Sequence, residues 1–517
     1  MKLKKILNSK SLIIFFIPFV LGSLCVLSFQ PFNFTFINFF TLPFLFLILT
    51  YVSKRSKNIY RKKPHLSNLF FVGYLFGVGF FLSGNYWISY SLTFDVSFQF
   101  LIPFSLILIP LFLGLFFGLS TLAIGSFLKN NFSSILIFCS SLAIADFLRS
   151  KILSGFPWNL WAYSWSWFPE VIQLLQPVGL FAFNLLTLTI FCSTLLLFFK
   201  NKKKNLAIYS ILIILFFSNY IYGSIKINKD KVINAEQINL KIVSPSFDLK
   251  YNLSNDQIES SIKKLIKYSE PDSNKETVFI WPEGIFAGYQ FKELLNYKFL
   301  FQEQFTENQI IILGVNTQED TTGEHYNSII AVNKNLDIMY QYNKRKLVPF
   351  GEFLPLEFLF TKLGLKKITQ GYGSFSKGVE QKNLNINQFN ILPLICYEII
   401  FTELIQKSDL DTNLIINISE DAWFGGTIGP QQHFAKAIFR AIESNTHLVR
   451  AANKGISAFI DNNGRILKSL EPYEAGSIEL NIPLINNSSR NRNDLIFFVL
   501  LFTYTLIFFT IKKKYND

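Results

Sequence analysis

Cysteine and histidine are scarce in this sequence, with four of each among 517 residues. Cys25, Cys139 and Cys192 lie inside long apolar runs, so Cys396 is the one cysteine in a stretch of ordinary polarity. That stretch therefore cannot form an internal disulfide, and the chain has no framework of paired cysteines. Cysteines and histidines show no metal-site spacing, and we expect neither a metal nor another cofactor.

Charged residues make up only 16% of the chain, and they are unevenly distributed. Residues 225–494 contain 29 Lys and Arg against 31 Asp and Glu, a net charge of −2. The remainder contains 20 against 4, so it holds the whole basic excess behind the net charge of +14. A basic excess confined to apolar regions indicates orientation in a membrane, and we expect no nucleic-acid partner.

Long apolar runs are abundant instead. Half of the chain is apolar, and it contains 59 phenylalanines. A transmembrane helix needs about 20 mostly apolar residues. The sequence predicts eight of them, at roughly 12–32, 36–53, 68–92, 100–128, 133–150, 172–199, 206–224 and 494–511.

These spans divide the chain into a seven-helix region at 1–224, a polar domain at 225–493, and a last helix with a basic tail at 494–517. Lysines before the first span suggest a signal peptide, but the apolar run has no clear cleavage site, so we expect it to be retained. Basic clusters occur at alternate connections. The positive-inside rule then places both termini in the cytoplasm and the polar domain outside.

The polar domain alternates predicted strands and helices, which favours a layered α/β or α+β fold. Strands are expected at 238–247 and 278–284, an amphipathic helix at 255–269, and a hairpin turn at Asn463-Gly464. Several later strands end in polar side chains. The polar residues at strand ends are Glu283, Cys396, Glu398, Glu420 and Asp421. Because loops at the carboxyl ends of strands often hold active groups, these residues are candidates for a site.

A cysteine placed at a strand end raises the question of its chemistry. A thiol attacks as the thiolate, so it needs a nearby base or positive charge. The histidines of this domain have no evident partner; they are His325, His433 and His447. A Glu–Lys–Cys set is chemically coherent, with Glu283 taking the thiol proton, Lys344 stabilising an oxyanion, and Cys396 carrying an acyl group.

Four motifs in this domain resemble the nitrilase, or carbon-nitrogen hydrolase, superfamily. They are "WPEG" (281–284), "NKRKLVPFGE" (343–352), "CYE" (396–398) and "DAWFG" (421–425). Enzymes of that superfamily use a Glu–Lys–Cys triad on an α-β-β-α sandwich. With the predicted spans before and after, and with "FQPF" (29–32), "GNYWISYS" (84–91) and "GFPWNLWAYS" (155–164), the chain resembles the apolipoprotein N-acyltransferase family. The implied fold is a multi-span helical membrane bundle joined to a nitrilase-like sandwich.

The resemblance implies a role for each matching residue. Glu283 is the expected base, Lys344 the oxyanion lysine and Cys396 the nucleophile. The spacing before "LVPFGE" selects Lys344 over its neighbour Lys346. The residues expected to support this triad are Glu352, Tyr397 and Glu398.

The resemblance also implies a ping-pong acyl transfer from a membrane phospholipid, through a thioester, to the α-amino group of a diacylglyceryl-cysteine on an apolipoprotein. We expect a monomer in the inner membrane with its catalytic domain in the periplasm. Glu420 stands where the family usually has asparagine, and an extra carboxylate there would oppose thiolate formation unless it points away.

Two rival functions use the same sequence features differently. A membrane-tethered nitrilase-type amidase would pass the acyl group of a small amide to water, although so many spans are hard to explain for a small soluble substrate. A transporter with a binding domain would need charged residues in the middle of its spans. Here the charges lie near span ends, so we rank transport last.

Overall fold

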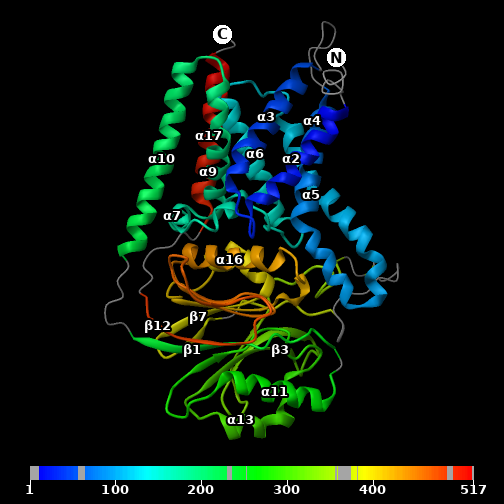
Figure 1. Ribbon diagram of the computed structural model, residues 1–517, viewed down its shortest axis with the longest axis vertical. Helices are drawn as coiled ribbons and strands as arrows, with labels where there is room; N and C mark the ends of the chain where they lie inside the picture. The colour runs from blue at the N-terminus through cyan, green and yellow to red at the C-terminus, as the bar shows by residue number, and fades with distance from the viewer. Residues whose placement is uncertain are drawn as a thin grey trace. The chain divides into compact units, whose positions relative to one another are not determined.

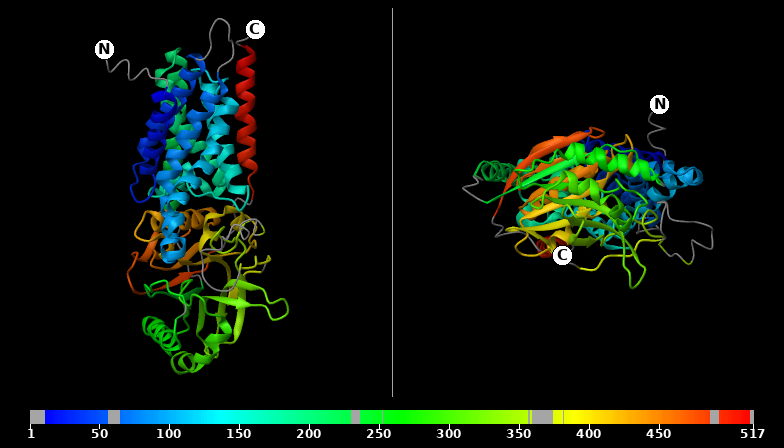
Figure 2. Two further views of the ribbon diagram at one scale, coloured as in Figure 1. Left: turned by 90° about the vertical axis from the view of Figure 1, so that its right-hand side faces the viewer. Right: turned by 90° about the horizontal axis from the view of Figure 1, so that it is seen from below.

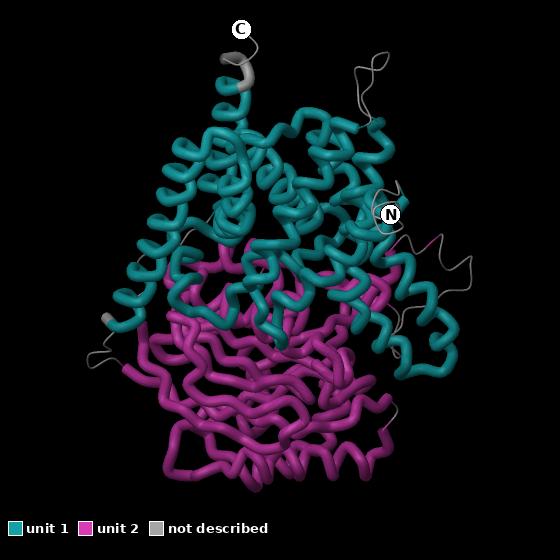
Figure 3. The backbone as a smooth tube through the Cα atoms, turned by 45° about the horizontal axis from the view of Figure 1, so that its top comes forward, with its two compact units in different colours: residues 1–229, 491–517 teal, residues 230–490 magenta. Residues whose placement is uncertain are grey.

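The computed structural model describes residues 11–55, 65–229, 236–251, 253–355, 358, 374–380, 382–485 and 493–514. The chain divides into two compact units, coloured separately in Figure 3. Residues 1–229 and 491–517 form one, called here the membrane unit. Residues 230–490 form the other, called here the sandwich domain.

The membrane unit is helical. Among the described residues, six helical segments are long and apolar enough to cross a membrane. They are Thr35–Arg55, Leu66–Phe94, Val96–Ile124, Phe132–Lys151, Leu180–Phe198 and Lys202–Asn228. The first and last predicted spans correspond to two shorter apolar helices, Leu12–Ser28 and Leu495–Ile511.

The main helices of this unit are α2 (Ile17–Cys25), α3 (Asn38–Arg55), α4 (Leu66–Asn85), α5 (Ile102–Ile124), α6 (Phe132–Lys151), α7 (Pro169–Ile172), α8 (Leu175–Val178), α9 (Leu180–Cys192), α10 (Lys202–Lys229) and α17 (Leu495–Lys514). The predicted span at 172–199 began too early. Its first residues form the end of α7 and the whole of α8, and Gly179, with φ of 81°, ends α8 before α9 begins. A positive φ cannot continue a right-handed helix, which explains the break.

The two buried charged side chains in the described part of the membrane unit are paired. Asp146 Oδ1 lies 2.9 Å from Arg149 Nη2 on the next turn of α6, and both side chains are buried. Asn184 of α9 donates to the second oxygen of Asp146 at 2.9 Å. A buried ion pair with an added hydrogen bond avoids the cost of an isolated charge in an apolar setting.

The sandwich domain consists of stacked layers. In its described residues the strands form two six-stranded sheets, ordered β12-β1-β2-β3-β4-β5 and β11-β10-β9-β8-β7-β6. The first sheet contains β1 (Gln237–Ser244), β2 (Val278–Ile280), β3 (Ile310–Gln318), β4 (His325–Val332), β5 (Ile338–Asn343) and β12 (Gly476–Pro483). The second contains β6 (Leu384–Ile386), β7 (Phe389–Ile395), β8 (Leu414–Glu420), β9 (His447–Asn453), β10 (Ser457–Ile460) and β11 (Ile466–Leu470).

Helices cover the outer faces of both sheets (Figures 1 and 2). Helices α11 (Asn255–Ser269), α12 (Phe291–Leu294) and α13 (Lys298–Gln304) lie on the side of the first sheet, and α16 (Gly429–Ser444) lies on the side of the second. The short helix α15 (Thr402–Gln406) precedes β8. This is the α-β-β-α sandwich expected from the resemblance.

The sequence explains these layers locally. Ser254 and Gln257 form a capping box at the start of α11, and Ile258, Ile262 and Leu265 face the first sheet from a single side of the helix. Between the sheets, apolar side chains of β1, β2 and β3 pack with those of β7, β8 and β9 in one buried cluster. Burial of these two apolar layers holds the sheets face to face.

Candidate active site

Cys396 occupies a sharp turn at the end of β7. Its φ is 47°, in the left-handed region that a non-glycine residue seldom adopts. Such a conformation costs on the order of 1–3 kcal/mol and persists only where its surroundings enforce it. The next residues form a short 3₁₀ turn, Cys396–Ile400, in which the Tyr397 ring packs edge-on against Phe401 at 5.1 Å. The cysteine is 9% exposed, so the thiol is nearly dry.

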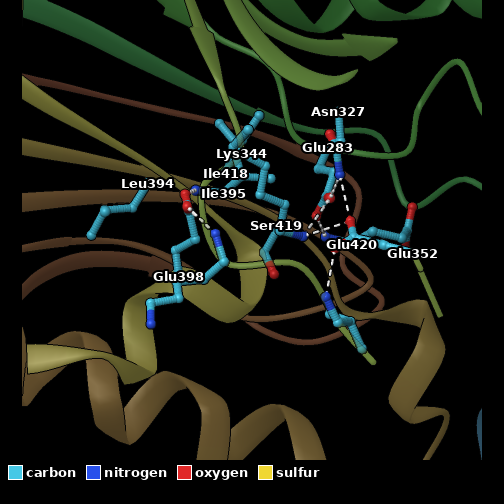
Figure 4. A network of polar contacts seen from close by, with 12 residues as sticks. Glu283, Asn327, Lys344, Glu352, Leu394, Ile395, Glu398, Ile418, Ser419 and Glu420 are labelled. Atoms are coloured by element: carbon cyan, nitrogen blue, oxygen red, sulfur yellow. Dashed lines mark hydrogen bonds and ion pairs between the residues drawn. The ribbon is translucent and has the colours of Figure 1, made fainter. Parts of the chain in front are cut away.

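Glu398 holds this turn in place through hydrogen bonds. Its buried carboxylate accepts hydrogen bonds from the backbone N–H groups of Ile395 (2.9 Å), Arg345 (2.7 Å) and Lys346 (3.0 Å), and from the Tyr342 hydroxyl at 3.0 Å to each oxygen. Figure 4 shows Glu398 beside Ile395. These donors come from the ends of β5 and β7. Glu398 therefore ties the segment that contains Lys344 to the turn that contains the cysteine.

The lysine side chain is buried between two carboxylates. Lys344 Nζ, 1% exposed, lies 2.8 Å from Glu352 Oε1 and 3.5 Å from Glu283 Oε1. Burial alone would lower the pKa of Lys344, but the charges of Glu283 and Glu352 outweigh it and raise that pKa. The amine is therefore a fixed cation. The neighbouring Lys346 instead pairs with Glu403, outside this cluster.

The two carboxylates share a donor that sequence analysis missed. Asn327 Nδ2, on β4, donates to Glu283 Oε1 at 2.7 Å and to Glu352 Oε1 at 2.8 Å (Figure 4). The other oxygen of Glu283 accepts the backbone N–H of Glu420 at 3.1 Å, and that of Glu352 accepts the Val348 N–H at 2.8 Å. Each carboxylate is thus held by a donor on both oxygens. Asn327 lies in the polar first half of β4, His-Tyr-Asn-Ser, ahead of the apolar Ile-Ile-Ala-Val, so the sequence did not single it out.

Glycine at position 314 allows the two sheets to approach each other here. A Cβ added to Gly314 on β3 would lie 2.8 Å from Glu283 Cα and 2.7 Å from Ile418 Cδ1 of β8. Both distances are shorter than any real Cβ contact. The absence of a side chain at this position lets Glu283, from the first sheet, stand beside the end of β8 in the second.

The cysteine thiol is protonated at rest. Burial raises the pKa of Cys396 well above that of a free thiol, and the charge of Glu283 raises it further. The Lys344 charge and a hydrogen bond from Ser419 act in the opposite direction. Because the thiol keeps its proton in the resting site, forming the nucleophile requires a base, and Glu283 is the carboxylate whose charge acts most on it.

The extra carboxyl of Glu420 lies close to Glu283 and has hydrogen-bond donors of its own. Its oxygens accept hydrogen bonds from Asn453 Nδ2, at 3.1 and 2.8 Å, and from the Ala422 N–H at 3.0 Å. Burial raises the pKa of Glu420 well above its usual range, despite these donors, and the charge of Glu283 adds to the rise. A carboxyl with a raised pKa ionises less readily, which weakens the opposition to thiolate formation that is expected from this position.

Asp421 and His433 form a second buried polar pair in this domain. Asp421 accepts two hydrogen bonds from Arg450 Nη2, at 3.0 and 2.8 Å, and its Oδ1 lies 3.1 Å from His433 Nδ1. Burial would raise the pKa of Asp421, yet Arg450 and His433 hold it below its ordinary value. Burial and the Arg450 charge lower the pKa of His433 to about 4. The pair is therefore a carboxylate with a neutral imidazole.

The arrangement as a whole suits acyl transfer. It presents a buried thiol, a carboxylate able to take a proton, and a fixed cation able to face an oxyanion. Over the part of the chain that the structure describes, no three His, Cys, Asp or Glu side chains are grouped to hold a metal ion. The active side chains lie at the ends of strands from both sheets. An α-β-β-α sandwich with a Glu, a Lys and a Cys at such strand ends is the carbon-nitrogen hydrolase type of domain.

Comparison with known proteins matches each of the two units to a protein family. Residues 244–486 match the family described as Carbon-nitrogen hydrolase, and residues 21–195 match the Apolipoprotein N-acyltransferase N-terminal domain. An apolipoprotein N-acyltransferase from Allorhizobium ampelinum is 31% identical over 87% of this chain and 86% of its own length. One from Rickettsia prowazekii is 32% identical over 90% of this chain and 91% of its own length.

The chain therefore belongs to the apolipoprotein N-acyltransferase family. It is an acyltransferase and a membrane protein, and the amidase alternative is not favoured. Among solved structures, an amidase from Nesterenkonia sp. is 15% identical, with a TM-score of 0.33 over 49% of this chain and 93% of that one.

Proposed function

We propose that this protein acylates apolipoproteins by a ping-pong reaction through a thioester on Cys396. The acyl chain comes from a membrane phospholipid and passes to the α-amino group of the diacylglyceryl-cysteine at the lipoprotein N-terminus. The observation that supports this most is the cluster formed by Lys344, Glu283 and Glu352 around a strained, buried cysteine. Family membership supplies the acceptor class.

In the first half-reaction Glu283 accepts the proton of Cys396, and the thiolate attacks the ester carbonyl carbon of the phospholipid. The resulting oxyanion faces the Lys344 ammonium, which stays protonated because two carboxylates flank it. Collapse of the tetrahedral intermediate forms the thioester and expels the lysophospholipid alkoxide. The proton held by Glu283 goes to that alkoxide, so the base is regenerated.

In the second half-reaction the lipoprotein amine attacks the thioester carbonyl. Glu283 takes a proton from the attacking nitrogen, and Lys344 again faces the oxyanion. Collapse expels the Cys396 thiolate and leaves the new amide. The thiolate then regains a proton from Glu283. A buried, nearly dry sulfur favours this route over hydrolysis, since a thioester shielded from water survives until an amine arrives.

The membrane unit fits substrates of this kind. Both the donor and the acceptor are anchored in a bilayer, so an enzyme that uses them must work at the bilayer surface. We further propose that the protein lies in the inner membrane with its sandwich domain in the periplasm. The alternation of basic clusters between connections supports this orientation.

The test uses the full-length protein in phospholipid-containing detergent micelles, with a synthetic diacylated lipopeptide as acceptor. Mass spectrometry of the Cys396 peptide should show an added acyl chain when phospholipid alone is present, and the lipopeptide should then remove it. Cys396→Ser should form no acyl-enzyme, whereas Cys192→Ala, which alters a buried cysteine of the membrane unit, should form it normally. Full transfer by Cys396→Ser would rule the mechanism out. Release of free fatty acid without lipopeptide acylation would favour the amidase.

A further inference from the structure

Ser419 lies beside the nucleophile on the neighbouring strand. Strands β7 and β8 run parallel and their last paired residues are Ile395 and Ile418, so Cys396, in the turn that follows β7, and Ser419 of β8 each come next after that pair. Ser419 is fully buried, and its hydroxyl donates to Asp421 Oδ1 at 2.7 Å. The same hydroxyl is within hydrogen-bonding reach of the Cys396 sulfur, and a bond donated to the thiolate lowers the pKa of the thiol.

Asp421 does not depend on this serine for its charge. Arg450 Nη2 reaches both of its oxygens, at 3.0 and 2.8 Å, and His433 Nδ1 lies 3.1 Å from Oδ1. A carboxylate held in this way remains satisfied when one further donor turns aside. Its negative charge by itself raises the pKa of Cys396 and therefore opposes the thiolate. A hydroxyl that hydrogen-bonds both groups can offset that opposition.

We propose that Ser419 is a further catalytic residue, whose hydroxyl hydrogen turns from Asp421 to the Cys396 sulfur whenever that sulfur becomes negatively charged. This inference rests on the proposed role of Cys396 as the acyl carrier. No proton passes through Ser419: the thiol proton goes to Glu283, and the hydroxyl only rotates its hydrogen bond.

The rotation would act in both half-reactions. When Glu283 deprotonates Cys396, the hydroxyl donates to the new thiolate. In the thioester the sulfur is uncharged and a poor acceptor, so the hydroxyl returns to Asp421. When the lipoprotein amine attacks, the departing sulfur regains its charge and receives the hydrogen bond again. Ser419 would then stabilise the nucleophile of the first step and the leaving group of the second.

The experiment compares Ser419→Ala, Ser419→Thr and Ser444→Ala in the full-length protein in phospholipid-containing micelles. Ser444 is an equally buried serine of α16 whose hydroxyl donates to the Arg440 carbonyl at 2.7 Å, outside the site. Thermal unfolding of each variant reports the stability of the fold. Two further readouts report the sulfur: the pH profile of Cys396 alkylation by iodoacetamide, followed by peptide mass spectrometry, and the rates of thioester formation and of transfer to a diacylated lipopeptide.

Ser419→Ala should shift the alkylation profile to higher pH and slow both half-reactions by roughly 10- to 100-fold, the usual worth of a hydrogen bond to a charged group. Ser419→Thr, which keeps the hydroxyl, should restore much of both, and Ser444→Ala should match the wild type. A Ser419→Ala alkylation profile that overlays the wild type would overturn the inference, even if rates or stability fell.

This design separates the two proposals. If wild-type protein forms no thioester on Cys396, the proposed function fails, while the alkylation profiles still report whether Ser419 contacts the sulfur. If wild-type protein forms the thioester and Ser419→Ala forms it equally fast, the inference alone fails.

Discussion

Lys344 is bound more closely to Glu352 than to Glu283. Its ammonium nitrogen lies 2.8 Å from Oε1 of Glu352 and 3.5 Å from Oε1 of Glu283. Glu352 thus fixes the position of the cation. Glu283 interacts with the lysine more weakly, because its Oε1 is further from the ammonium nitrogen. This division suits a site in which Glu283 must accept and release a proton in every turnover while the lysine stays charged.

Replacing the lysine should slow acyl transfer severely. Lys344→Met removes the cation that faces the oxyanion, and loss of one such donor costs roughly 10²- to 10³-fold in rate. It also leaves Glu283 and Glu352 without the charge between them, so stability should fall as well. Thioester formation on Cys396, followed by mass spectrometry, measures the first effect.

The matched control is Lys346→Met, two residues further along. Lys346 pairs with Glu403 and lies over the Phe401 ring at 4.8 Å, outside the carboxylate cluster. A partly exposed ion pair contributes only about 0–1 kcal/mol, so this variant should retain thioester formation. Equal losses in the two variants would contradict the assignment of the oxyanion lysine to position 344.

Asn327→Ala should slow acylation without removing any group of the proposed triad. The amide nitrogen of Asn327 donates to Glu283 and Glu352 at 2.7 and 2.8 Å, and its loss leaves Lys344 as the remaining donor to both of these carboxylate oxygens. Hydrogen bonds to charged groups are worth about 1.5–3 kcal/mol, which corresponds to a drop of at least tenfold in the rate of thioester formation.

Asn333→Ala provides the comparison for this amide. Asn333 lies in the turn after β4 and accepts backbone N–H groups of Asn335 and Asp337, at 2.8 and 3.0 Å, away from the site. Its loss should lower stability slightly and leave the acylation rate per folded molecule unchanged. An Asn327→Ala enzyme with a wild-type rate would show that Glu283 needs no donor from β4.

Local sequence patterns predicted much of this fold. The apolar spacing of α11 and the Asn463-Gly464 turn are confirmed: Gly464 has φ of 81°, and β10 and β11 pair antiparallel on either side of it. These features depend on neighbours in the chain. Strand lengths were less accurate: the strand expected at 278–284, with a break at Pro282, is regular only to Ile280, although the Trp281 N–H still donates to the Ile312 carbonyl at 2.8 Å.

Features that join distant segments could not be predicted in the same way. Asn327 lies in a strand with no distinctive motif, and only the pairing of β4 beside β3 brings its amide to Glu283. His433 had no evident partner in the sequence, yet its ring contacts Asp421, twelve residues earlier and on another element. The positive φ of Cys396 also left no trace in the sequence. Tertiary packing sets all three.

Glu420→Gln should make the sandwich domain more stable at high pH relative to the wild type. The pKa of Glu420 is raised in the folded state, so the folded protein retains a proton that the unfolded chain releases above its ordinary pKa of about 4.3. Folding is then linked to proton uptake, and wild-type stability falls as pH rises through that window. Glutamine keeps the shape and cannot ionise.

Denaturant unfolding of both proteins at pH 5 and pH 8 measures this effect. The difference in unfolding free energy should shift in favour of the variant at pH 8. Thioester formation should continue, because Glu283 receives the backbone N–H of residue 420 rather than its side chain. Parallel pH dependences in the two proteins would mean that Glu420 is already ionised in the folded state.

His433→Gln should flatten the loss of stability in mild acid. The pKa of His433 is lowered to about 4 in the folded protein, against about 6.5 for an unperturbed histidine. Between these values the unfolded chain binds a proton that the folded protein does not, so wild-type stability falls as pH drops from 6.5 toward 4. Two and a half pKa units correspond to about 3 kcal/mol across that range.

Glutamine does not titrate, so native-state hydrogen exchange of β8 and α16 should show a variant that is less stable at pH 7 but loses less stability on acidification. Equal losses between pH 7 and pH 4 in both proteins would place the acid sensitivity in other groups, and His433 would then be charged already in the folded domain.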